Sequence, residues 1–78
     1  MSDRVHARKL NMIRQLRFEM RISARAIGVL GGRERARQWL QSPLKILGGK
    51  TPLQMLSTAR GARKVEHVLG RLEHGVFF

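Results

Sequence analysis

The sequence has no cysteine and no tyrosine, and only one tryptophan and two prolines among its 78 residues. Without cysteine there is no disulfide, no thiol nucleophile and no thiolate metal ligand, and a reducing compartment such as the cytoplasm is expected. No apolar run approaches the ~18–20 residues that cross a bilayer, and the basic N-terminus lacks the apolar stretch and cleavage site of a signal peptide. We therefore expect a cytoplasmic protein without a membrane partner.

Acidic residues are also scarce: there are five, against sixteen lysines and arginines, which gives a net charge of +11. Such a charge favours acidic partners of any kind, whether nucleic acid, anionic lipid or an acidic protein. Twelve of the sixteen basic residues are arginine, which suits bidentate contacts to phosphate or carboxylate. Charge alone does not choose among these partners.

A chain of this length forms one small domain and buries only ~60–65% of its unfolded surface. Disulfides are excluded, and the sequence shows no plausible set of metal ligands. The remaining common source of stability is another protein chain. We therefore expect a homo-oligomer, a permanent hetero-oligomeric complex, or both.

Apolar spacing and helix-ending residues predict an all-α fold, a small bundle of about four helices in which a long basic helix precedes a three-helix core. Gly31-Gly32 and Pro43 end helices, whereas Thr51-Pro52 resembles an N-cap followed by proline at the first helical position. Trp39 is predicted to point inward as a core anchor. The first predicted helix covers about residues 4–30, with an interruption allowed. The other three cover about residues 33–41, 52 to 57 or 58, and 59–74.

The first helix carries two apolar rows, which indicates that it buries more than one face. One row includes Phe18, Ile22 and Val29. The other is predicted to mediate oligomerisation, with Ile13, Leu16, Met20 and Ile27 as its contact residues. The helix also carries regularly spaced arginines, which form either a solvated face or contacts to an acidic partner or DNA phosphates. The candidate phosphate contacts are Arg8, Arg14, Arg17, Arg21 and Arg25.

Signatures of catalysis and of cofactor or metal binding are weak. The segment from Gly48 to Thr51 reads GGKT, but a P-loop needs glycine where this chain has Leu44 and a helix that Pro52 does not continue. His67 and His74 lie about two helical turns apart, ~10 Å, too far to chelate one metal. No serine sits in a recognisable acid–base constellation. We expect no enzymatic activity, cofactor or metal site.

An ordered set of residues in the second half of the chain resembles the C-terminal toxin-binding domain of the Xre–MbcA–ParS antitoxin family. Each piece alone is common, but their order and spacing are specific. The resemblance covers about residues 26–78 and leaves residues 1–25 as a basic N-terminal helical extension. The residues that carry it are Ala36, Trp39-Leu40, Pro43, Leu47-Gly48-Gly49, Thr51-Pro52-Leu53, Leu56, Thr58, Gly61, Val65, Leu69 and Glu73 to Val76.

This resemblance implies an antitoxin of a type II toxin–antitoxin system, whose partner is a RES-type toxin that consumes NAD. It also implies that the C-terminal region covers the entrance of the toxin's active site. Gly75 would end the last helix and release an apolar tail that packs either on its own core or, as we favour, on the partner. The predicted toxin-binding residues are Arg71, Glu73, His74, Gly75, Val76, Phe77 and Phe78.

Many members of the family carry a helix-turn-helix domain before the toxin-binding domain, and the residues preceding it here are too few for one. The chain is then either a naturally short member or a fragment, and any DNA binding is expected to be weak and salt-sensitive. The alternative function is a standalone nucleic-acid-binding or transcriptional regulatory module, supported by the charge. A third alternative, an amphipathic protein that binds a membrane surface, would account for the sequence of the first helix only.

Overall fold

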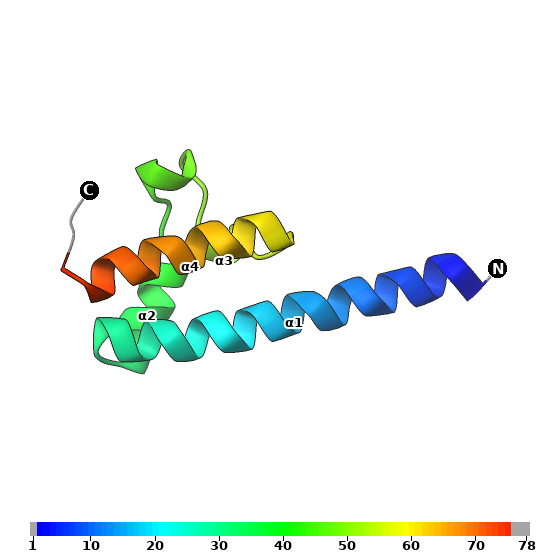
Figure 1. The fold of residues 1–78 in the computed structure, drawn as a ribbon, viewed down its shortest axis with the longest axis horizontal. Helices are drawn as coiled ribbons and strands as arrows, with labels where there is room; N and C mark the ends of the chain where they lie inside the picture. Colours follow the sequence, from blue (N-terminus) through cyan, green and yellow to red (C-terminus); the bar gives the residue numbers. More distant parts are fainter. Residues whose placement is uncertain (1, 76–78) are drawn as a thin grey trace.

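The computed structural model is built from four α-helices and one short 3-10 helix (Figure 1). The elements are α1 (Ser2–Leu30), α2 (Arg33–Leu40), η1 (Lys45–Leu47), α3 (Pro52–Met55) and α4 (Ala59–Glu73). The structure describes the backbone of residues 2–75 and the side chains of residues 7–75. No strand occurs in residues 2–75, and the all-α prediction is confirmed. None of the described helices combines the length and the apolar character needed to span a membrane.

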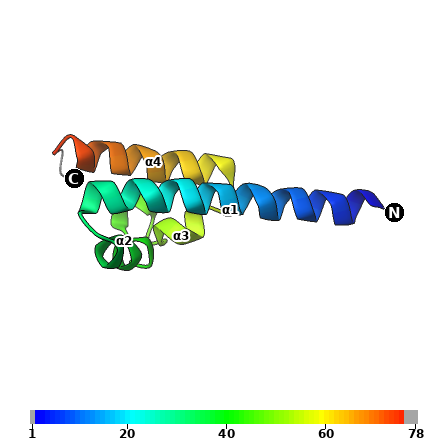
Figure 2. The same cartoon turned by 90° about the horizontal axis from the view of Figure 1, so that it is seen from below.

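The two long helices, α1 and α4, lie side by side and run in the same direction (Figures 1 and 2). α2 packs against α1, and α3 contacts both α2 and α4. The N-terminal half of α1 extends beyond all the other helices, so the molecule measures 49 × 24 × 18 Å. The packed part of the fold therefore uses only the C-terminal half of α1.

The core contains side chains from α1, α2, η1 and α4, together with Leu56 after α3. Burial of their apolar surface is the main force that holds these short elements together. α1 contributes Ile22 and Ala26, both fully buried, and α4 contributes the largest share. The remaining core residues are Ala36, Leu40, Leu47, Leu56, Ala62, Val65, Val68 and Leu69.

Two threonines start the last two helices. The Thr51 hydroxyl accepts a hydrogen bond from the Gln54 backbone N–H, and the Gln54 side chain accepts one from the Thr51 N–H. This reciprocal capping box, with Pro52 at the first helical position, confirms the predicted start of α3. The Thr58 hydroxyl caps α4 in the same way by accepting from the Gly61 N–H at 3.0 Å.

Gly61 allows α4 to approach the end of α3 closely. A Cβ atom at this position would lie 1.9 Å from the carbonyl oxygen of Met55. Backbone atoms cannot yield as a flexible side chain can, so any larger residue would push the two helices apart. Glycine is therefore required here for packing, although it is a poor helix former.

α1 is continuous from Ser2 to Leu30, without the interruption that the prediction allowed. Two other details differ from the prediction. α3 ends at Met55 because Thr58 must adopt an extended backbone to cap α4. Trp39 is partly buried and packs at the edge of the core, since Ala36 and Leu40 define the buried face of α2. The predicted boundary between residues 25 and 26 falls within α1, between the buried residues Ile22 and Ala26.

An ion pair on the exposed face of α2 joins two residues three positions apart. Arg37 donates two hydrogen bonds to the carboxylate of Glu34, near the start of the helix. The guanidinium holds the pKa of Glu34 below its usual value, because it stabilises the ionised form. The pair supports α2 locally and lies outside the core.

Candidate functional site

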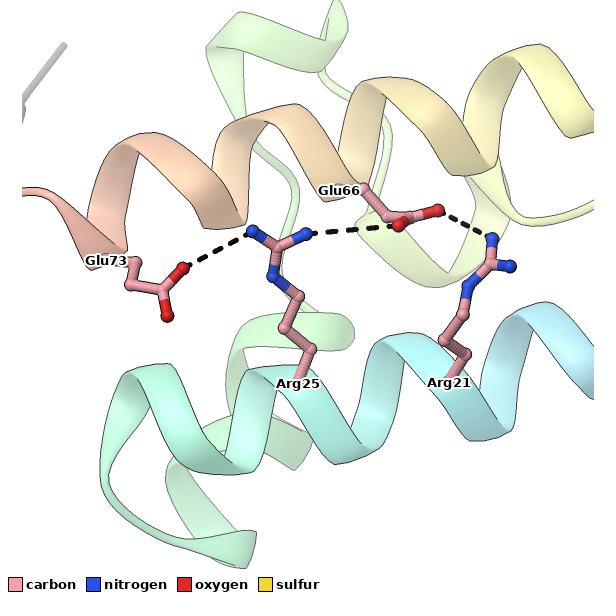
Figure 3. A network of polar contacts seen from close by, with 4 residues as sticks. All are labelled: Arg21, Arg25, Glu66 and Glu73. Atoms are coloured by element: carbon pink, nitrogen blue, oxygen red, sulfur yellow. Dashed lines mark hydrogen bonds and ion pairs between the residues drawn. The ribbon is translucent and has the colours of Figure 1, made fainter.

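A chain of ion pairs connects α1 to α4 along their common edge (Figure 3). Arg21 Nη2 lies 2.6 Å from Glu66 Oε1, and Arg25 contacts Glu66 Oε2 at 3.9 Å and Glu73 Oε1 at 3.4 Å. Because the two helices run in the same direction, Arg21 and Arg25 meet Glu66 and Glu73 in the same order along both helices. Both acidic residues of α4 are thereby turned toward α1.

A hollow of about 460 Å³ lies beside this network, along α4. Four basic or histidine side chains of α4 follow one another at intervals of four, four and three residues, which places them on one helix face. Arg25 reaches the same hollow from α1, and its charge is partly offset by Glu66. The lining residues are Arg25, Arg63, Glu66, His67, Gly70, Arg71 and His74.

α4 ends at Glu73, where the chain turns sharply. The His74 N–H donates to the Gly70 carbonyl, and the Gly75 N–H donates to the Leu72 carbonyl at 3.1 Å. Gly75 has a φ of 75°, a left-handed conformation that other residues adopt only with strain. The predicted helix stop at this glycine is confirmed.

Four of the seven predicted toxin-binding residues lie together at this end of α4. Arg71, Glu73, His74 and Gly75 are all exposed. Glu73 also pairs with Arg25, so it has a structural contact of its own. The other three predicted residues, Val76, Phe77 and Phe78, lie outside the described residues.

The four residues predicted to mediate oligomerisation do not share one surface. Ile13, Leu16 and Met20 are 47%, 54% and 72% exposed on the surface of α1. Ile27 instead packs against the core of its own chain. The apolar row therefore divides into an exposed stripe of three residues and one residue that serves the fold.

The predicted phosphate contacts divide in the same way. Arg8, Arg14 and Arg17 are exposed on the projecting half of α1. Arg21 and Arg25 face α4 and are held by carboxylates, with the Arg21 guanidinium also 5.6 Å from the centre of the Phe18 ring. The network neutralises these two arginines, so they are poorer phosphate contacts than the other three.

A second hollow, of about 390 Å³, lies on the other flank of α4 where η1 approaches it. Ile46, Leu47 and Val68 supply its apolar surface, and Arg63, Lys64 and His67 supply its basic rim. The predicted helices leave residues 42–51 outside any element, so η1 and this hollow were not predicted. The apolar pair Ile46-Leu47, just before Gly48-Gly49, was the signal that could have revealed it.

Nothing in the described part of the chain resembles a metal centre: no three residues among His, Cys, Asp and Glu come close enough together to hold an ion. The features that are present are basic side chains, exposed apolar side chains and shallow hollows. These features suit contact with another macromolecule through charge and apolar burial.

Residues 23–75 match the model of a family described as "Antitoxin Xre/MbcA/ParS C-terminal toxin-binding domain". The chain belongs to this family. The match begins in the packed half of α1, includes all of α2, η1, α3 and α4, and ends at Gly75. It leaves out the projecting half of α1.

Curated relatives carry the name "Antitoxin Xre". The relative from Yersinia enterocolitica is 41% identical over 59 residues, which are 74% of this chain and 40% of the relative. The relative from Photorhabdus laumondii is 38% identical over 73% of this chain and 39% of its own length. The relative from Pseudomonas putida is 39% identical over 69% of this chain and 34% of its own length. The matched region thus spans well under half of each relative. No solved structure matches the chain.

Proposed function

We propose that this chain is the toxin-binding part of an antitoxin, which neutralises a RES-type, NAD-consuming toxin by covering its active-site entrance. The observation that carries the proposal is the family match, which extends through α4 to Gly75. The end of α4 exposes Arg71, Glu73 and His74 at the point where the chain turns away from the helix. The segment that follows is the part we assign to the toxin's entrance.

In this mechanism α4 acts as a rigid support. It is anchored by Val65, Val68 and Leu69 in the core and tied to α1 through Glu66 and Glu73. A supported helix end loses little conformational entropy on binding, which favours tight association. Val76, Phe77 and Phe78 would supply apolar anchors, and Arg71 and His74 a polar rim around them.

The proposal is tested by expressing this chain together with the protein encoded beside it. We expect the neighbour to arrest growth when expressed alone, and to be harmless and to co-purify with this chain when the two are expressed together. A neighbour that is not toxic, or that remains toxic and does not co-purify, would contradict the proposed function.

A second candidate function is supported by the exposed arginines of the projecting α1 half, which suit nucleic-acid backbone. Arg8, Arg14 and Arg17 could each contact a phosphate, since all three are exposed. For a few such contacts, affinity should fall at least about tenfold between 50 and 200 mM salt and be independent of DNA sequence. A footprint on one palindromic site that persists at high salt would favour a regulator and weaken the antitoxin proposal.

A further inference from the structure

We propose that the hollow between η1 and α4 is a second contact surface for the toxin, and that it receives an acidic segment presenting one large apolar side chain. This inference rests on the proposed function and extends it from the end of α4 to a different flank of that helix. The juxtaposition that supports it is an apolar floor, made of Ile46, Leu47 and Val68, beneath a purely basic rim.

The floor of the hollow is apolar and partly open. Leu47 and Val68 are buried in the core, whereas Ile46 remains 47% exposed. The volume of about 390 Å³ is within the range of sites that hold small ligands, so it can accept a large side chain. Covering Ile46 would remove apolar surface from water, which favours binding of an apolar group.

The rim of the hollow carries positive charge without compensating acids. Among residues 7–75, no ion pair involves Arg63 or Lys64. Glu66 lies on the same helix but is turned away, toward Arg21 and Arg25 on α1. Carboxylates on a partner would therefore meet Arg63 and Lys64 with no competing acid from this helix.

The nature of the occupant follows from the combination of the floor and the rim. Duplex DNA would satisfy the rim with its phosphates, but its bases are paired and stacked and so do not fill an apolar floor. A second copy of this chain would bring a net charge of +11 to an already basic rim, which disfavours it there. An acidic protein segment satisfies both features, and the toxin is the protein partner that the proposed function supplies.

The location of the hollow allows one toxin molecule to contact both the C-terminal end of α4 and its η1 flank. Arg63 and His67 line this hollow and also the larger one that contains Arg71 and His74. At 1.5 Å per helical residue, His67 and His74 are separated by only about 10 Å along the axis. A partner seated at the end of α4 would therefore reach the η1 flank within an interface of ordinary size.

The test uses the full chain and its purified toxin partner, with affinity measured by titration calorimetry at fixed salt. Two variants probe the surface. Ile46→Asp places a negative charge in the hollow, which would repel the acidic occupant, and the double variant Arg63→Glu with Lys64→Glu reverses the charge of the rim. The matched control is Arg33→Glu with Arg35→Glu, the same charge change at two exposed positions of α2. Thermal unfolding followed by circular dichroism verifies that each variant is folded.

We expect each of the two surface variants to weaken toxin binding by at least about tenfold, because both act on a desolvated contact. The control should change affinity by less than about threefold, since it alters only the long-range field. Folded surface variants that bind like the parent chain would overturn this inference while leaving the proposed function intact. Surface variants that lose affinity for duplex DNA but not for the toxin would overturn this inference in favour of a nucleic-acid contact. A parent chain that binds no toxin would overturn both the inference and the proposed function.

Discussion

Arg21 on α1 and Glu66 on α4 are joined at 2.6 Å although they are 45 positions apart in the sequence. Their side chains are 59% and 27% exposed, so water and salt screen the pair considerably. In a double-mutant cycle with Arg21→Gln and Glu66→Gln, we expect a coupling free energy of about 0.2–1 kcal/mol at low salt. Urea unfolding at low and high salt measures it. A coupling free energy of zero at low salt would contradict the contact between Arg21 and Glu66.

Gly61 should be far less tolerant of substitution than Gly70, although both lie in α4. Gly61→Ala would place a methyl group 1.9 Å from the Met55 carbonyl oxygen, and we expect a loss of about 1–3 kcal/mol or more in the free energy of unfolding. Gly70→Ala is the control, because its Cβ would meet only the mobile end of Arg25 at 3.3 Å. It should be neutral or stabilise the protein by up to about 1 kcal/mol. Equal effects of the two changes would contradict the close packing of α3 on α4.

Self-association through α1 is predicted from the exposed apolar stripe of Ile13, Leu16 and Met20. Leu16→Glu with Met20→Glu should dissociate any oligomer, whereas Leu53→Glu on α3 serves as a control outside this stripe. Because apolar contact would act against repulsion between two strongly basic chains, association should strengthen as salt is raised. Analytical ultracentrifugation at several salt concentrations measures both effects. A parent chain that sediments as a monomer at all of them would show that the stripe does not associate.

Features with a local cause were predictable from the sequence. Thr51-Pro52 specifies the start of α3 through its own side chain and ring, and Gly75 specifies the end of α4 through its backbone freedom. Val65, Val68 and Leu69 follow the i, i+3, i+4 spacing of one apolar helix face, and all three are buried. In each case the residues that determine the structure are neighbours in the chain.

Features that depend on packing between distant segments were not predictable. Periodicity placed Ile27 in one row with Met20, but Ile27 packs against the core, whereas Met20 is 72% exposed although it also lies in the C-terminal half of α1. Likewise, the pairing of Glu66 with Arg21 and Arg25 depends on α1 and α4 running side by side in the same direction, which nothing in the sequence shows. The hollow beside Ile46 has the same origin, since it forms only where η1 approaches α4.

The central claim, neutralisation of an NAD-consuming toxin through the C-terminal segment, is tested most directly by the NAD content of cells. The toxin would be expressed alone, with the full chain, and with a chain truncated after Gly75, which keeps every described helix. We predict that NAD falls with the toxin alone, is preserved by the full chain, and falls again with the truncated chain, because apolar anchors each contribute about 2 kcal/mol or more to binding. NAD that is unaffected by the toxin, or that the truncated chain preserves as well as the full chain does, would contradict this account.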